Sequence, residues 1–91
     1  MYDVHLTSQY RREYKKAKKR KLNMELLDEI IILLAKNDEP LPAKYNDHNL
    51  YGDYTGYREC HIENDWLLIY KKEKKDLILV LTRTGSHSDL F

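Results

Sequence analysis

The fold is decided by the stretch Tyr57-Arg-Glu-Cys-His-Ile-Glu-Asn-Asp-Trp-Leu-Leu-Ile-Tyr-Lys-Lys-Glu-Lys-Lys-Asp-Leu-Ile-Leu-Val-Leu-Thr-Arg-Thr84. Three runs rich in strand-forming residues, 57–62, 66–72 and 77–84, are separated by polar segments at 63–65 and 73–76. Connections this short join strands that lie side by side and run in opposite directions. The stretch therefore predicts an antiparallel three-strand meander.

Upstream of the meander, the sequence predicts one strand and two helices. Residues 2–6 alternate in character, which is typical of a short strand. Thr7 and Ser8 offer N-caps for a helix that runs to about Lys21, and Asn23 caps a second helix. The second helix carries apolar residues at helical spacing, which we expect in the core: Leu26, Leu27, Ile30, Ile31, Leu33 and Leu34. Two helices before a meander indicate an α+β fold with the helices packed against one sheet.

Length and composition restrict the class of protein. The 91 residues suit a single domain, 1–91, in which the segment 36–55 is expected to be a loop. The longest apolar run, Ile30–Ala35, falls far short of the ~20 residues that cross a membrane, and the first residues do not resemble a signal peptide. The single cysteine, Cys60, excludes an internal disulfide. We therefore expect a soluble cytoplasmic protein that makes no membrane contact.

Positive charge is concentrated in the predicted first helix. Eight of the 16 basic residues lie between Arg11 and Lys21, against one acid, Glu13. That segment therefore carries a net charge of +7, and because the whole chain carries +1, the remainder carries −6. Such a helix attracts a polyanion or an acidic protein, although charge runs also occur on solvated helix faces. The cations that we expect to bind substrate are Arg11, Arg12, Lys15, Lys16, Lys18 and Lys19.

Ionisable side chains gather at the ends of the meander strands. Alternation places Glu59 and His61 on one face of the first strand, and it places Arg83 on the same face as Leu81 of the last strand. Asp65 follows the turn after His61, so these two side chains are expected to face each other. This pairing would orient the imidazole and favour its charged form.

A second histidine, His87, lies four residues after Arg83. Two imidazoles, a carboxylate and an arginine suit the cleavage of RNA by its own 2′-hydroxyl, because this reaction needs a base, an acid and a cation near the phosphate but no metal. Taken singly, each histidine could instead be structural. Zinc is a further alternative, with ligands from His48, His61, Asp65 and His87, but their spacing matches no compact zinc motif. We expect no metal and no cofactor.

These residues carry a resemblance to a known family. The runs Asp47-His-Asn-Leu-Tyr-Gly52, Gly56-Tyr-Arg-Glu-Cys-His-Ile62, Asp65-Trp-Leu-Leu-Ile-Tyr70 and Arg83-Thr-Gly-Ser-His-Ser-Asp-Leu-Phe91 resemble the YafQ branch of the RelE superfamily. The resemblance covers nearly the whole chain. It implies a RelE-like fold and the toxin of a bacterial type II toxin–antitoxin module, which cleaves messenger RNA, typically on the ribosome. The RelE branch proper, with lysines and arginines in place of most of these histidines, fits less well.

The resemblance also implies roles for individual residues. Positions with functional roles in the YafQ branch are occupied here by His48, His61, Asp65, Trp66, His87 and Phe91, and a phosphate-binding position by Arg83. His87 with either Asp65 or His61 would be the acid/base pair, and Arg83 with His48 would hold the phosphate. Trp66 and Phe91 would contact the substrate and shape the site. The chain departs from the family pattern at Asn64, where proline is expected.

The expected partners follow from the same resemblance. They are messenger RNA with the ribosome, and a small DNA-binding antitoxin with an acidic C-terminal segment. Operator DNA would be bound only through the toxin–antitoxin complex. A second hypothesis remains open: a catalytically weak or degenerate toxin that acts mainly by binding RNA and antitoxin through the basic helix.

Overall fold

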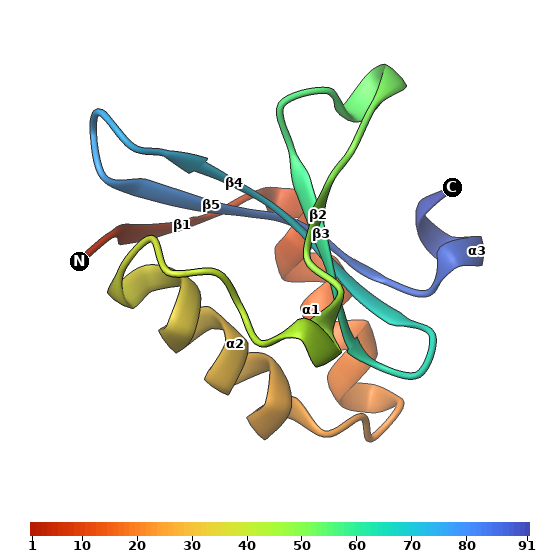
Figure 1. The fold of residues 1–91 in the computed structure, drawn as a ribbon. Coiled ribbons are helices and arrows are strands. Elements are labelled where there is room, and N and C mark those ends of the chain that lie inside the picture. Colours follow the sequence, from red (N-terminus) through yellow and green to blue (C-terminus); the bar gives the residue numbers. More distant parts are fainter.

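The computed structural model describes residues 1–91 as one five-stranded sheet covered by helices (Figure 1). The strands are β1 (Asp3–Leu6), β2 (His48–Asn49), β3 (Arg58–Glu63), β4 (Trp66–Glu73) and β5 (Ile78–Gly85), in the order β1-β5-β4-β3-β2. The antiparallel meander β3-β4-β5 confirms the prediction from sequence. Two pairings were not predicted: β1 runs parallel to β5, and β2 adds to the free edge of β3.

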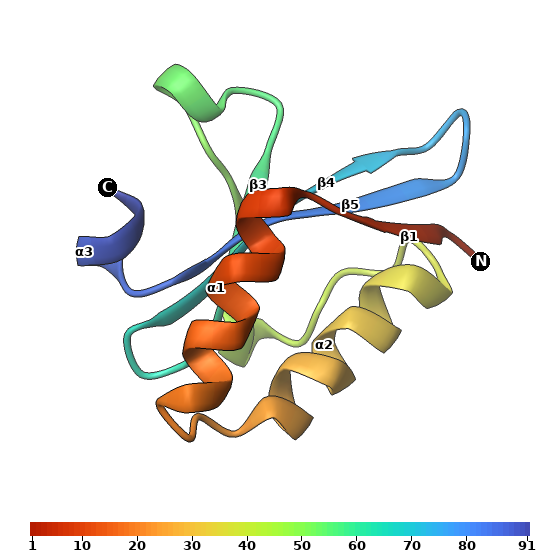
Figure 2. The same cartoon turned by 180° about the vertical axis from the view of Figure 1, so that it is seen from behind.

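The two predicted helices are present, and each begins at a predicted cap. They are α1 (Ser8–Lys19) and α2 (Met24–Lys36), and a short third helix, α3 (His87–Leu90), ends the chain. The hydroxyl of Thr7 accepts a hydrogen bond from the Tyr10 amide at the start of α1. The Asn23 side chain accepts one from the Glu25 amide at the start of α2. Figure 2 shows α1 and α2 together on one side of the sheet.

The main core lies between these helices and the sheet. Its largest members include Leu27 and Ile30 of α2, Trp66 and Tyr70 of β4, and Leu81 of β5. The predicted apolar face of α2 is too wide, because Leu33 is 40% exposed whereas Leu27 and Ile30 are fully buried. No helix of the protein is both long enough and apolar enough to cross a membrane.

The opposite face of the sheet carries α3 and the connection between β2 and β3. Leu90 of α3 packs there on Leu67 and Ile69 of β4. On β5, the register changes between the pairs Tyr70↔Leu81 and Ile69↔Arg83, so Thr82 is an extra residue. The expectation that Arg83 shares a face with Leu81 is therefore wrong: the bulge turns Arg83 away from the main core and towards α3.

The segment expected to be one loop, 36–55, has more structure than the sequence suggested. It contains the short 3₁₀ helices η1 (Ala43–Tyr45) and η2 (Gly52–Tyr54) as well as β2. Arg58 and Tyr70 both donate hydrogen bonds to Asp47, at 3.2 and 2.7 Å, and thereby tie the start of β2 to β3 and β4. This anchoring brings His48 to the same face of the sheet as α3.

Candidate active site

Four aromatic rings form a row across the face of the sheet that carries α3. His48 of β2 lies beside His61 of β3, with ring centroids 6.2 Å apart, and His61 lies 5.9 Å from His87 of α3. His87 in turn lies 6.4 Å from Phe91, whose ring is 63% exposed. Residues from three distant parts of the sequence therefore meet at one open surface.

Asp65 holds His87 in position. One carboxylate oxygen of Asp65 accepts hydrogen bonds from Nδ1 of His87, at 2.6 Å, and from its backbone amide, at 3.2 Å. These bonds lower the pKa of Asp65, the ring bond most strongly. The expected pairing of Asp65 with His61 is wrong, because α3 places His87 above the turn between β3 and β4. With Nδ1 committed to Asp65, Nε2 of His87 is left to exchange a proton with a substrate.

The turn that carries Asp65 has a left-handed residue at its centre. Asn64 has a φ of +49°, a conformation that asparagine tolerates. A proline is fixed near −65° and could not adopt it. The departure from the expected proline at Asn64 therefore changes the backbone of the turn, while Asp65 still reaches His87.

Glu59, which was not among the predicted site residues, lies beneath the row of histidines. Its side chain is almost fully buried, and Oε1 lies 3.4 Å from Nε2 of His48 and 3.9 Å from Nε2 of His61. Its second oxygen, Oε2, has no hydrogen-bond partner. Strand alternation had placed Glu59 beside His61, and this was the signal that could have identified it. Glu59 therefore places a buried carboxylate beside two of the imidazoles.

The backbone of the connection before β2 fixes the ring of His48. Nδ1 of His48 lies 2.6 Å from the carbonyl oxygen of Asn46, an acceptor, so this nitrogen carries a proton. Nε2 then faces Glu59. His48 is thus oriented at both nitrogens, which leaves neither of them free to exchange a proton with a substrate.

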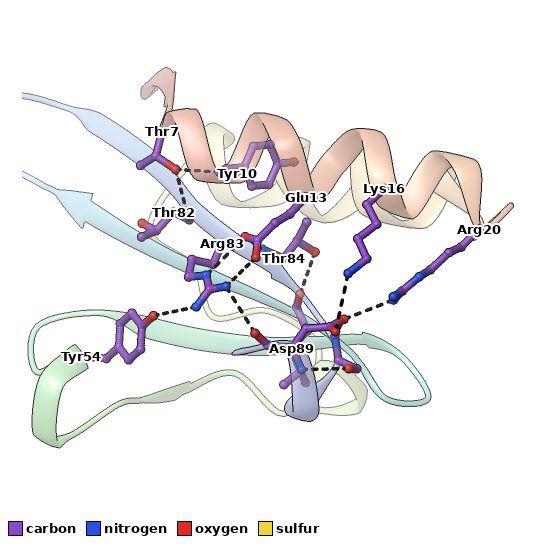
Figure 3. Close-up of polar contacts among 12 residues, drawn as sticks. Thr7, Tyr10, Glu13, Lys16, Arg20, Tyr54, Thr82, Arg83, Thr84 and Asp89 are labelled. Atoms are coloured by element: carbon purple, nitrogen blue, oxygen red, sulfur yellow. Dashed lines mark hydrogen bonds and ion pairs between the residues drawn. The ribbon is translucent and has the colours of Figure 1, made fainter. Parts of the chain in front are cut away.

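Arg83 reaches the same surface from β5 and is held by four acceptors (Figure 3). Its guanidinium donates to both carboxylate oxygens of Glu13, at 2.6 and 3.3 Å, to the Tyr54 hydroxyl at 3.3 Å and to the backbone oxygen of Asp89 at 3.4 Å. These bonds, chiefly those to Glu13, raise the pKa of Arg83. A fixed cation therefore lies next to the helix that carries His87.

Trp66 does not reach this surface. Its indole is buried in the main core, on the helix side of the sheet, and its N–H donates to the hydroxyl of Thr84 at 2.9 Å. The expectation that Trp66 binds substrate is therefore wrong as a direct contact. Because Thr84 in turn donates to the Leu67 carbonyl, Trp66 instead braces the ends of β4 and β5, next to which α3 begins.

The cations at and near α1 lie on different faces of the helix. Lys16 and Arg20 face α3, at 3.9 and 3.2 Å from the carboxylate of Asp89 (Figure 3). Arg11, Lys15 and Lys18 line a groove on the other side of α1, which has an apolar floor made of Val4, Leu6, Tyr10, Tyr14, Ile31 and Leu81. Arg12 and Lys19 are exposed. Of the six predicted substrate-binding cations, Lys16 alone forms an ion pair with α3.

Comparison with known proteins identifies the family. The model of the family described as bacterial toxin of type II toxin-antitoxin system, YafQ, matches residues 2–91. The mRNA interferase toxin YafQ of Escherichia coli K12 is 45% identical over 89 residues, which are 98% of this chain and 95% of that protein. YafQ in the crystal structure of the E. coli DinJ–YafQ complex has 42% identity and a TM-score of 0.90, with 100% and 99% of the two chains covered. A metal-bound toxin from Helicobacter pylori has 36% identity, a TM-score of 0.92 and full coverage of both chains. The chain therefore belongs to the YafQ family of bacterial toxins of type II toxin–antitoxin systems.

Proposed function

We propose that this toxin is a metal-independent endoribonuclease that cleaves messenger RNA, and that it acts on the ribosome in the cytoplasm. The observation that carries the proposal is the row of His61, His87 and Phe91, in which Asp65 fixes the tautomer of His87. Two imidazoles at this separation can serve as base and acid on opposite sides of one phosphate. The naming of the E. coli relative as an mRNA interferase supports the proposal.

The reaction uses the nucleophile that RNA carries. One of the two imidazoles, His61 or His87, removes the proton of a 2′-hydroxyl, and O2′ attacks the adjacent phosphorus. The bond from phosphorus to the 5′-oxygen breaks, a 2′,3′-cyclic phosphate forms, and the other imidazole protonates the departing oxygen. Arg83 and His48 offset the charge that develops on the phosphate. Phe91 offers an exposed ring on which a base stacks.

The test is the replacement of His87 in the full chain. We expect His87→Ala to lower the rate of cleavage of translated messenger RNA by ~10²–10⁴-fold and to abolish growth arrest on expression. His5→Ala is the matched control, because His5 is exposed on β1, the edge strand farthest from β2. Growth arrest that persists in His87→Ala would support the alternative function, a degenerate toxin that acts by binding.

The proposed partner is an antitoxin with an acidic segment, and the pair would bind operator DNA as a complex. The crystallised complex of the E. coli relative with DinJ supports a partner of this kind. The groove beside α1 suits it, because Arg11, Lys15 and Lys18 border an apolar floor that includes Val4 and Leu6. An acidic segment with apolar side chains would complement both the charge and the floor.

A second candidate function, metal-dependent inhibition, is favoured by Glu59, His61 and His87. The ligand atoms of these residues lie within 4.8 Å of one another, and Asp65 leaves Nε2 of His87 free, as carboxylates commonly do for metal-binding histidines. Two nitrogens and a carboxylate oxygen suit a zinc or copper ion. We propose that such an ion occupies the imidazoles and stops cleavage. The crystallisation of the H. pylori relative with bound metal supports the proposal.

Titration calorimetry with Zn²⁺ tests this second candidate. We expect one ion per chain in the parent and none in His61→Ala, with His5→Ala as the control. Binding that persists unchanged in His61→Ala would exclude the site.

A further inference from the structure

Glu13 is the one acid in the basic segment of α1, and it points away from solvent towards β5 (Figure 3). Both Glu13 and Arg83 are largely buried, with side chains 16% and 15% exposed. Glu13 is the one carboxylate among eight cations of its segment, and it is largely shielded from water. We therefore expect it to have a specific role. Neither the proposed reaction nor the antitoxin groove uses it.

The sheet leaves a gap that the Glu13 side chain fills. β1 pairs with β5 only as far as Leu6↔Leu81, after which the chain turns into α1. The Thr84 amide, beyond that point, has no strand on this side and donates instead to Oε1 of Glu13, at 3.2 Å. The same carboxylate receives two bonds from the Arg83 guanidinium. The Glu13 side chain of α1 therefore accepts the hydrogen bond that the backbone of a neighbouring strand would otherwise accept.

The remaining bonds of Arg83 fix the direction of its guanidinium. An arginine has five N–H donors in a rigid plane. Nε donates to Glu13, Nη2 to Glu13 and the Asp89 carbonyl, and Nη1 to Tyr54. These bonds use four donors, so one N–H of Nη1 remains. The Tyr54 ring lies edge-on to that of Phe91, with 5.8 Å between the ring centroids, so the acceptor of Nη1 adjoins the residue at the end of the row of histidines.

We infer that Glu13 is a positioning residue for the ribonuclease reaction: it holds Arg83 so that its one free N–H donor meets the RNA phosphate. The inference rests on the proposed function of the site. A bidentate carboxylate fixes both the plane and the angle of a guanidinium, which a single acceptor would leave free to rotate. Because cleavage depends on fixed charge at the phosphate, small displacements of Arg83 reduce the rate.

The opposite role for Glu13 would be a mask that phosphate must displace. The two roles predict opposite effects of Glu13 on the rate of RNA cleavage. A positioning residue supports cleavage, whereas a mask competes with RNA for the guanidinium. Glu13→Gln distinguishes them, because glutamine keeps an acceptor for the Thr84 amide but loses the charge and the second acceptor for Arg83.

The experiment compares the parent with Glu13→Gln, Arg83→Ala, the double variant and Glu29→Gln, a control at an exposed position of α2. The measurements are single-turnover cleavage of ribosome-bound messenger RNA and binding of an RNA oligonucleotide made uncleavable by 2′-O-methylation. We expect Glu13→Gln to slow cleavage about tenfold while the affinity changes by less than about twofold. In the Arg83→Ala background it should cause no further loss, since its effect passes through Arg83.

Nuclear magnetic resonance of the Arg83 Nε–H gives a measurement independent of activity. We expect a signal protected from solvent exchange in the parent and in Glu29→Gln, and lost in Glu13→Gln. Faster cleavage or tighter RNA binding in Glu13→Gln would overturn the inference in favour of a mask. If the losses of cleavage rate in Glu13→Gln and Arg83→Ala add in the double variant, the inference would be overturned in favour of a purely structural role for Glu13. If the parent does not cleave RNA, the proposed function fails, and an Nε–H signal unchanged by Glu13→Gln would separately refute the hold on Arg83.

Discussion

Asp65 and His87 meet only because α3 folds back over the turn between β3 and β4. The carboxylate accepts from both the ring and the amide of His87, so the neutral ring carries its proton on Nδ1. We predict that Asp65→Ala shifts the neutral ring towards the Nε2–H form that an unconstrained imidazole prefers. Long-range ¹H–¹⁵N spectra of the His87 ring at alkaline pH measure this ratio of tautomers. An unchanged ratio in Asp65→Ala would show that Asp65 does not set the tautomer.

Two buried tyrosines differ in whether the hydroxyl has a partner. The hydroxyl of Tyr70 donates to Asp47, and burial together with this bond raises its pKa. The hydroxyl of Tyr10 is buried without a partner. We predict that Tyr70→Phe lowers the free energy of unfolding by about 1 kcal/mol, whereas Tyr10→Phe leaves it unchanged or raises it by up to about 1 kcal/mol. Urea unfolding of both variants measures the difference, and a larger loss in Tyr10→Phe would contradict it.

The elements differ in how far the sequence could predict them. The meander was readable because its strands are long, apolar and joined by short turns. The pairing of β1 with β5 was not readable, because residues 75 positions apart, such as Leu6 and Leu81, leave no trace in the local sequence pattern. The two-residue strand β2 left no such trace either. The bulge at Thr82 was equally invisible, since alternation assumes that no residue is extra. That one residue decides whether Arg83 faces the core or the site.

The site residues show the same limit. The pattern of the strand ends indicated His61 and His87, the resemblance added a role for His48, and the structure brings all three together. Their partners come from tertiary contacts that only the fold reveals: Asp65 binds His87 rather than His61, and Glu13 reaches Arg83 across 70 residues of sequence.

The C-terminus of α1 has a residue type that its backbone disfavours. Lys21 has a φ of +61°, and the Lys21 and Leu22 amides donate to the Lys18 and Ala17 carbonyls, which is the Schellman arrangement. Glycine is preferred at this position because a side chain strains a left-handed backbone. We predict that Lys21→Gly raises the free energy of unfolding by about 0.5–1 kcal/mol. Lys18→Gly, inside the helix, should lower it by about 1 kcal/mol. A loss of stability in both variants would contradict the cap.

At the scale of the whole molecule, α1 separates two surfaces that carry the same charge. Lys16 and Arg20 face Asp89 of α3, whereas Arg11, Lys15 and Lys18 border the apolar groove. Under the proposed function, the helix would contact RNA on the side of α3 and an acidic antitoxin segment on the side of the groove. An antitoxin bound in the groove would add its negative charge close to the RNA surface and would weaken RNA binding without covering the histidines.

This division predicts that the two surfaces can be impaired independently. We expect Arg11→Gln/Lys15→Gln/Lys18→Gln to weaken antitoxin binding at least tenfold while the isolated toxin retains most of its cleavage rate, because charge at a complementary interface governs association. We expect Lys16→Gln/Arg20→Gln to lower RNA affinity and to flatten its salt dependence by up to about two in the slope of log K against log salt, since each cation that meets a phosphate releases about one counterion. Calorimetry with the antitoxin and salt-dependent RNA binding measure the two effects. If both variants lose both functions equally, α1 acts as a single undivided cationic surface, and the antitoxin would then have to compete with RNA for the same side chains.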